Sequence, residues 1–144
     1  MSRQVSVAFG HRGRMTPQAL LDRLVDLFPD FRAYWDDPGN CPRDEDGSFT
    51  LHGVFVEFTG FFRDRHAALP ADRIAALGAF VSECMAPADD GPLDNAAATC
   101  FVENIAGEPC DRELSPHLTG EARRYWQTWG GRAEPDAAPD RPRD

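Results

Sequence analysis

The chain of 144 residues is long enough for one domain with a proper hydrophobic core and too short for two comfortable ones. Its formal net charge of -9 disfavours binding to nucleic acid or to an anionic membrane, and it favours a basic partner. No apolar run approaches the roughly 20 residues of a membrane span, and residues 1–10 hold no stretch of secretion-signal length. We therefore expect a cytoplasmic protein. Plain solubility is the alternative explanation of the charge.

The two ends of the chain are predicted to lie outside the folded domain. Residues 1–15 carry three arginines and no acid, and their sequence V-S-V-A-F fits either a short edge strand or a loose arm. Residues 131–144 hold three prolines and mixed charges, so they cannot bury enough apolar surface to become ordered. We expect a disordered tail there, and a helical domain over residues 16–130.

The first predicted helix has a clear start and a clear stop. Thr16 provides an N-cap hydroxyl, and Pro17 suits the first helical position. Leucine and phenylalanine side chains then recur at helical spacing over residues 20–28. Pro29 stops or kinks the helix, and a short aromatic turn over residues 31–35 continues the same face.

The next segments are a loop and an ambiguous apolar stretch. Residues 36–48 hold two prolines, two glycines and five acids, which is typical of a loop. Residues 49–69 fit both an alternating and a helical pattern. We favour a helix because 20 residues are too many for one strand, although Gly53 weakens a helix by about 1 kcal/mol relative to alanine. A further helix starts at Leu69-Pro70, with Ile74, Leu77, Val81 and Met85 on its inner face.

Residues 90–107 are the stretch around which the chain is expected to be organised. Asp89 or Asp90 can cap this helix, and Gly107 can close it. Small and apolar residues on one line predict a helix packed from two sides: Leu93, Ala97, Cys100 and Asn104. Residues 107–118 are predicted as a loop, and a last helix with a large aromatic face follows Thr119. The sequence thus predicts an all-α bundle, or a short stack of helix pairs, of about five helices.

The cysteines offer little chemistry at the level of sequence. They are scattered without a C-x-x-C pair, and we expect free thiols: Cys41, Cys84, Cys100 and Cys110. We expect no cofactor, no metal and no catalytic residue. The alternative is a small metal-binding regulator or enzyme that uses Cys110 and His117, which share one predicted loop; Cys41 and His52 would complete a zinc site without typical ligand spacing. The chain has no lysine, which excludes lysine-based Schiff-base chemistry.

Glu103 is the acid that the pattern singles out. A carboxylate in a largely apolar helix must reach solvent or find a partner, and Arg123 or Arg124 of the last helix could form a cross-helix ion pair with it. We therefore predict structural roles for these three residues.

Several motifs in a fixed order resemble a known family. They are A-L-L-D-R-L-V-D-L-F-P-D-F, F-V-E-F-T-G-F-F, and D-N-A-A-A-T-C-F-V-E-N-I followed by L-T-G-E-A-R-R-Y-W. Together they resemble a family of small, mostly helical bacterial domains of unknown function, over roughly residues 17–130. Such domains are similar in size and style to immunity proteins that neutralise toxins used between bacteria. The resemblance implies no catalytic residues.

The charge and the family resemblance together suggest one hypothesis. The protein is acidic and neutralises a basic partner, most plausibly a cognate toxin. Residues 81–113 hold eight acids against Arg112 alone. The acids expected to contact the partner lie there and in the 36–48 loop: Asp44, Glu45, Asp46, Asp89, Asp90, Asp94, Glu108 and Asp111. The aromatic face near Tyr125 and Trp129 is a second possible contact surface, or a dimer interface.

Overall fold

The protein is all-helical over the residues that the computed structural model describes, 15–37, 47–86 and 91–130. These ranges contain no strand, and they form seven helices when the continuous segment 91–105 is counted once. The all-α prediction is therefore confirmed, although the number of helices is larger than the expected five. The expected N-terminal arm or edge strand and the expected C-terminal tail lie outside the described residues.

The first two helices follow the sequence signals closely. Helix α2 (Pro17–Leu27) begins where Thr16 Oγ1 accepts a hydrogen bond of 3.0 Å from the backbone N–H of Ala19. Helix α3 (Asp30–Asp36) begins directly after Pro29, as the break in the pattern predicted. The two long helices follow, separated by the 3-10 turn η2 (His66–Ala68): α4 (Leu51–Arg65) and α5 (Ala71–Cys84).

The ambiguous stretch is thus a helix, and its N-cap is Thr50, whose Oγ1 accepts a hydrogen bond of 2.9 Å from Gly53 N. Apolar burial decides the outcome, because α4 hides four phenylalanine rings completely: Phe55, Phe58, Phe61 and Phe62. Each ring stabilises the fold by roughly 1.5–3 kcal/mol relative to an exposed position. Phe58 lies at the centre of this cluster, 5.1 Å from the ring centroid of Phe31 and 5.6 Å from that of Phe101.

The second half of the chain contains shorter elements. A continuous helical segment consists of α6 (Gly91–Ala97), the π-helix η3 (Ala98–Val102) and α7 (Glu103–Ile105). The expected loop over 107–118 instead contains α8 (Asp111–Leu114) and the 3-10 turn η4 (Ser115–His117), before α9 (Gly120–Thr128). The loop prediction was therefore wrong over residues 111–117, whereas Leu114 in α8 and Leu118 after η4 are buried, as was expected of two leucines that anchor this segment.

The π-helix changes which side chains face the core. Leu93 and Ala97 are buried as predicted, but Cys100 is only half-buried and Asn104 is exposed. The buried face of the segment runs instead through Ala97, Phe101 and Ile105, which leaves Cys100 and Asn104 at its edge. The prediction of one straight line through Cys100 and Asn104 was therefore wrong.

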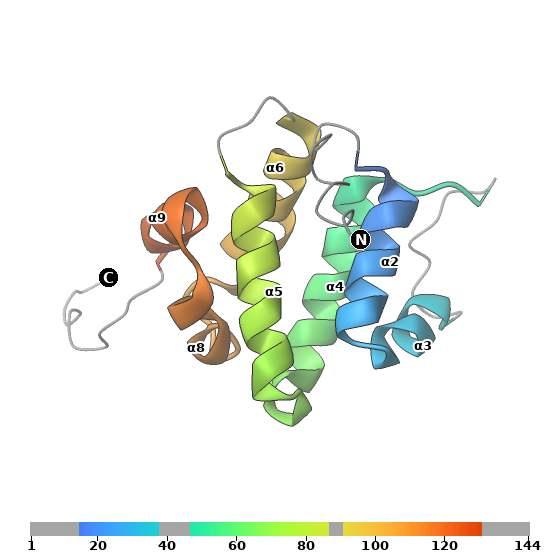
Figure 1. Ribbon diagram of the computed structural model, residues 1–144, viewed down its shortest axis with the longest axis horizontal. Helices are drawn as coiled ribbons and strands as arrows, with labels where there is room; N and C mark the ends of the chain where they lie inside the picture. The colour runs from blue at the N-terminus through green and yellow to red at the C-terminus, as the bar shows by residue number, and fades with distance from the viewer. Residues whose placement is uncertain (1–14, 38–46, 87–90, 131–144) are drawn as a thin grey trace, which may run out of the picture.

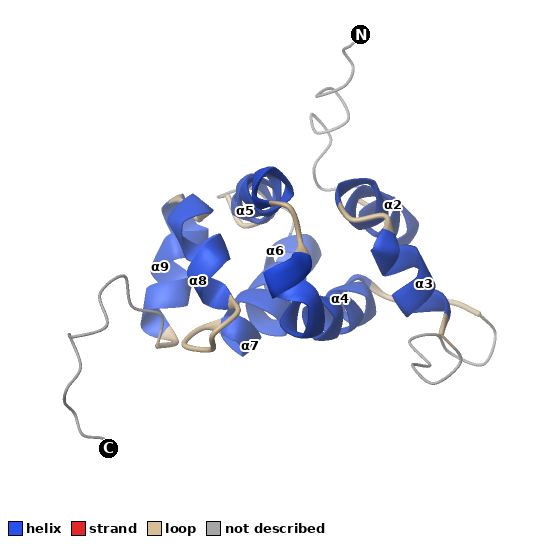
Figure 2. Cartoon of the chain, turned by 90° about the horizontal axis from the view of Figure 1, so that it is seen from below, coloured by secondary structure: helices blue, strands red, loops and turns tan. Residues whose placement is uncertain are grey.

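The helices form two layers with a smaller group at one end. Figure 2 shows α2 and α5 in one layer and α4 with α6 in the other. Helix α4 contacts α2, α3, α6, η3 and α7. At opposite ends of the molecule lie α3 and the α8–α9 pair, and the latter packs on α5 and η3 (Figure 1).

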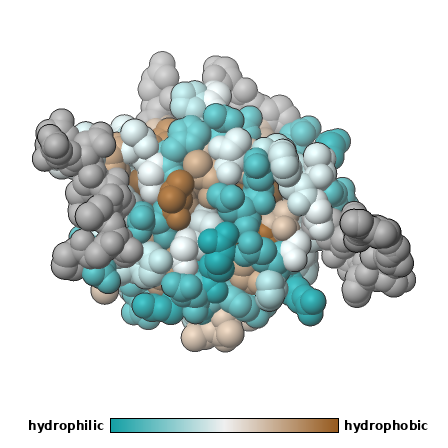
Figure 3. All heavy atoms as spheres, turned by 180° about the vertical axis from the view of Figure 1, so that it is seen from behind, coloured by the Kyte–Doolittle hydropathy of each residue, from teal (hydrophilic) through white to brown (hydrophobic). Residues whose placement is uncertain are grey.

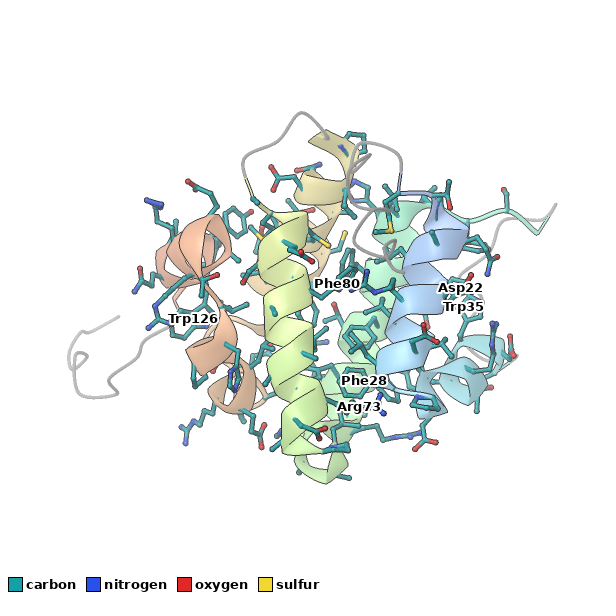
Figure 4. All side chains as sticks on the ribbon, viewed as in Figure 1. Asp22, Phe28, Trp35, Arg73, Phe80 and Trp126 are labelled. Atoms are coloured by element: carbon teal, nitrogen blue, oxygen red, sulfur yellow. The ribbon has the colours of Figure 1, made fainter. Side chains whose placement is uncertain are left out.

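Two contacts of α5 fix its place between these groups. At its start, Arg73 Nη1 donates hydrogen bonds of 2.9 Å to the carbonyl oxygens of Asp26 and Leu27, which end α2 (Figure 4). Near its middle, Gly78 lies against His117, since a Cβ added there would be 2.4 Å from His117 Cβ. None of the helices described is both long enough and apolar enough to cross a membrane.

Candidate binding groove

An open groove of about 510 Å³ lies where α6 and η3 meet α9 and the end of α5. Polar and apolar groups of these elements line it together: Met85, Asp94, Asn95, Ala98, Glu121, Arg124, Tyr125 and Thr128. In Figure 1, α6 lies behind the upper end of α5 and α9 lies on the other side of α5 in projection; the groove thus joins segments that are far apart in sequence. The mixture of carboxylates, an amide and an aromatic ring suits a polar, cationic ligand surface.

The side chain of Tyr125 connects the groove to Glu103. Tyr125 Oη donates a hydrogen bond of 2.9 Å to Glu103 Oε1 across the α7–α9 contact. Burial of the ring raises the pKa of Tyr125 above its usual 10.0, and the hydrogen bond and negative charge of Glu103 raise it further. Tyr125 therefore stays neutral at physiological pH and remains a donor.

The predicted partner of Glu103 was wrong, because a tyrosine takes the place of the expected arginine. Arg123 Nη1 donates to the carbonyl oxygen of Ser115 at 3.0 Å, and its guanidinium lies 5.2 Å from the centre of the Trp126 ring. Arg124 Nη2 lies 3.3 Å from Glu121 Oε2 in an exposed pair one turn away on α9. Because successive residues of a helix point about 100° apart, Arg123 lies towards η4 while Arg124 lies in the groove lining.

The predicted aromatic face of α9 is divided between core and surface. Trp126 is buried, whereas Trp129 is 48% exposed at the end of the helix. The ring centroids of Trp129 and Tyr125 are 6.1 Å apart, so Trp129 adjoins the groove through Tyr125. An exposed tryptophan beside carboxylates is a residue type that interfaces use as an anchor.

The structure separates the acids expected to contact a partner. Of these, Asp94 lines the groove. Glu108 Oε1 accepts a hydrogen bond of 2.8 Å from Arg63 Nε, in an ion pair between α4 and the turn after α7. Five of the predicted acids lie outside the described residues: Asp44, Glu45, Asp46, Asp89 and Asp90.

Asp111 was wrongly predicted to contact a partner. Its side chain is buried, with a relative exposure of 6%. Its Oδ2 accepts hydrogen bonds from Trp126 Nε1 at 2.8 Å and from the backbone N–H of Gly107 at 2.7 Å. Asp111 thus joins α8 to α9 and to the turn at Gly107, where φ is +84°. It contributes to the fold, and it is not available to a partner.

The described residues do not bring Cys110 and His117 together in a metal site, and Cys41, a further candidate ligand, lies outside them. The Cys110 thiol is 2% exposed, and burial followed by the nearby charge of Glu108 raises its pKa to about 11. The His117 side chain is exposed, and His52 contacts a different cysteine. Within ranges 15–37, 47–86 and 91–130, no three or more histidine, cysteine or acidic side chains form a group that could hold a metal ion.

One contact was missed at the level of sequence. His52 Nδ1 lies 3.2 Å from Cys100 Sγ, between the first turn of α4 and the π-helix. These residues are 48 positions apart. No local pattern could pair them, because the contact depends on how α4 packs against η3.

The fold and groove define a small all-helical protein with an acidic sequence and a polar, aromatic-edged surface depression. A family model described as a domain of unknown function (DUF7674) matches residues 21–130, and the protein belongs to that family. The predicted resemblance to a helical family of unknown function is confirmed to this extent. No curated protein and no solved structure matches the chain.

Proposed function

We propose that the protein is an acidic binding protein that covers a basic surface of another protein through the groove between α6 and α9. The observation that carries the proposal is the combination of two carboxylates that line the groove, Asp94 and Glu121, with the exposed ring of Trp129, which adjoins the groove through Tyr125. The net charge of -9 supports a cationic partner, because it attracts basic surfaces over long range.

The groove suits an arginine or lysine side chain of the partner. Carboxylates bind the cationic head, and an indole face attracts the same head by a cation–π interaction worth about 0.5–2 kcal/mol. The protein already shows this preference internally, since Arg124 pairs with Glu121 and Arg123 lies on Trp126. A partner cation can compete with Arg124 for Glu121, because both side chains are largely exposed.

The broader surface favours a localised contact. The back of the molecule is largely polar, and its apolar side chains form separate spots (Figure 3). On a surface of this kind, most of the binding energy comes from a few residues such as an aromatic anchor, and the polar contacts around it exclude water. This supports a groove-centred interface more than a wide apolar one.

The partner that we propose is a cytotoxic enzyme, which this protein neutralises in the cytoplasm by covering its active surface. The support is the resemblance of the ordered motifs to small bacterial domains of immunity-protein style, together with the acidic charge. Electrostatic steering would speed the encounter between the two proteins.

The test uses the polypeptide encoded next to this protein's gene as the probe. We expect it to be toxic when expressed alone, harmless when both proteins are made, and bound to the purified protein. Trp129→Ala should weaken binding at least about 30-fold, which corresponds to a hot-spot residue. Val56→Ala, at an equally exposed apolar position on α4, is the matched control and should bind normally.

The carboxylates are tested in the same assay. The double variant Asp94→Asn, Glu121→Gln should slow association, whereas Asp26→Asn on the distant α2 should not. A neighbour that is harmless alone, or binding that is equal in all four variants, would contradict the proposal.

The second candidate, a metal-binding regulator or enzyme at Cys110 and His117, is distinguished by metal analysis. Stoichiometric metal in the purified protein, lost on Cys110→Ser, would replace the binding proposal. The buried thiol and its raised pKa make Cys110 a poor ligand and nucleophile.

A further inference from the structure

We propose that Cys100 and His52 form a thiol–imidazole pair at which hydroperoxides oxidise the Cys100 sulfur to a sulfenic acid. This site is separate from the groove, and the inference does not depend on the proposed binding function. It rests on the contact between the two side chains, on the backbone that holds Cys100, and on the contrast with the other described cysteines.

The two side chains are within hydrogen-bonding distance in a half-buried position. His52 Nδ1 lies 3.2 Å from Cys100 Sγ. With the ring proton on Nε2, Nδ1 can accept the thiol proton, which is the arrangement of a nucleophile with its base. Thr99 Oγ1, 3.7 Å from the same sulfur, adds a polar neighbour.

Helix α4, which carries His52, also holds the backbone of Cys100 in place. The π-helix changes the hydrogen bonding of its carbonyl groups, and the Cys100 carbonyl accepts from Thr59 Oγ1 at 2.6 Å and from Asn104 Nδ2 at 3.0 Å. Thr59 follows His52 by two turns of α4, so both residues contact Cys100 from one face. The sulfur is thereby fixed next to the imidazole, and π-helical turns are frequent at functional sites.

The other described cysteines are less accessible than Cys100. Cys84 and Cys110 are buried among apolar side chains. Burial also raises the pKa of Cys110 to about 11. Cys100 is the most accessible of the three described thiols, and His52 lies beside it.

The reaction is balanced with the peroxide as the oxidant. The sulfur attacks one peroxide oxygen while His52 takes the thiol proton. An S–O bond forms, and the O–O bond breaks. The leaving hydroxide, or the alkoxide of an organic hydroperoxide, then receives the proton from His52 and departs as water or as an alcohol. Sulfur is oxidised by two electrons to S–OH, and the peroxide is reduced by the same two. A small oxidant suits a half-buried sulfur between packed helices.

The test treats the full chain with hydrogen peroxide, traps sulfenic acid with dimedone, and measures each cysteine-containing peptide by mass spectrometry. We expect Cys100 to react at least about tenfold faster than glutathione at the same pH, as base assistance predicts. Cys84 and Cys110 should react more slowly than Cys100. A Cys100 rate equal to or below that of glutathione would overturn the proposal, and this comparison requires no variant.

Variants then identify the base. His52→Asn should reduce the Cys100 rate to that of glutathione or below, while His66→Asn, which removes a histidine paired with Glu113, should leave it within twofold. Far-UV circular dichroism checks the fold of each variant. An unchanged Cys100 rate in folded His52→Asn would also overturn the proposal. A fast reaction with iodoacetamide but not with peroxide would contradict the choice of oxidant.

Discussion

At the scale of single residues, the fold depends on acids that the charge pattern had placed on the surface. Asp111 shows this most directly, because its carboxylate is buried and its Oδ2 accepts two hydrogen bonds, one of them from the buried indole of Trp126. A run of eight acids in residues 81–113 suggested one anionic surface, but individual acids in that run serve different purposes. Glu103 accepts a hydrogen bond from Tyr125, and Glu108 forms an ion pair with Arg63. Asp94 lines the groove.

Replacing Asp111 should therefore destabilise the protein strongly. Asp111→Ala leaves the Trp126 indole N–H and the Gly107 amide without their acceptor, and we expect the free energy of unfolding to fall by about 3 kcal/mol. Asp111→Asn keeps an acceptor oxygen and should lose less. Urea unfolding of both variants, beside the exposed Asp26→Ala as control, measures the difference. A loss below about 1 kcal/mol for Asp111→Ala would show that the two donors find water instead.

A second residue-scale prediction concerns pH. The folded pKa of Cys110, about 11, lies above its ordinary value of 9.0. The stabilising effect of the buried neutral thiol is complete below pH 9, and it is lost as the pH rises through 11, because only the unfolded chain ionises within that window. The stability of the protein relative to Cys110→Ala should fall by about 1.4 kcal/mol per pH unit there. Thermal unfolding of both proteins from pH 7 to 11 tests this, and a constant difference would contradict it.

At the scale of elements, local signals predicted much and tertiary packing decided the rest. Thr16 and Pro17 marked the start of α2, and the stripe through Ile74 and Leu77 marked α5, because caps and helical periodicity lie within a few residues of each other. The π-helix was not predictable in this way. Its cause is the fit of η3 against α4, where Thr59 and Cys100 meet across 41 residues of sequence.

The groove was predictable only in part for the same reason. The aromatic cluster of α9 was visible in the sequence, and Asp94 was among the expected contacts. Only the tertiary structure shows that these residues of α6 and α9 line one groove. The α8 turn was missed because proline and acidic residues at 108–116 are typical of loops, although Leu114 is fully buried.

Thr59 should stabilise the π-helix measurably. Thr59→Val keeps the shape of the side chain but removes the hydroxyl whose single proton is shared between the Cys100 and Phe55 carbonyl oxygens. We expect unfolding free energy to fall by about 1–2 kcal/mol, and amides of residues 98–102 to exchange faster with deuterium. Thr128→Val, which removes a similar bond on the exposed end of α9, should change stability by less than about 0.5 kcal/mol. Equal effects would show that Thr59 has no special part in holding the π turn.

At the scale of the whole molecule, charge and shape give separate contributions to the proposed binding. The net charge of -9 acts over distances up to the Debye length and affects how fast a basic partner arrives. The groove and Trp129 act only on contact, and they affect how long the partner stays. Association and dissociation rates can therefore be changed independently.

Raising the salt concentration from about 50 mM to about 500 mM should lower the association rate at least about tenfold, with a smaller effect on dissociation. Trp129→Ala should do the opposite, raising the dissociation rate and leaving association nearly unchanged, because it removes contact area without changing charge. Stopped-flow or surface-based kinetics with the neighbouring gene product separates the two effects, with Val56→Ala as the control for loss of an exposed apolar side chain. An association rate indifferent to salt would mean that the anionic charge serves solubility. A dissociation rate indifferent to Trp129 would place the contact surface elsewhere on the protein.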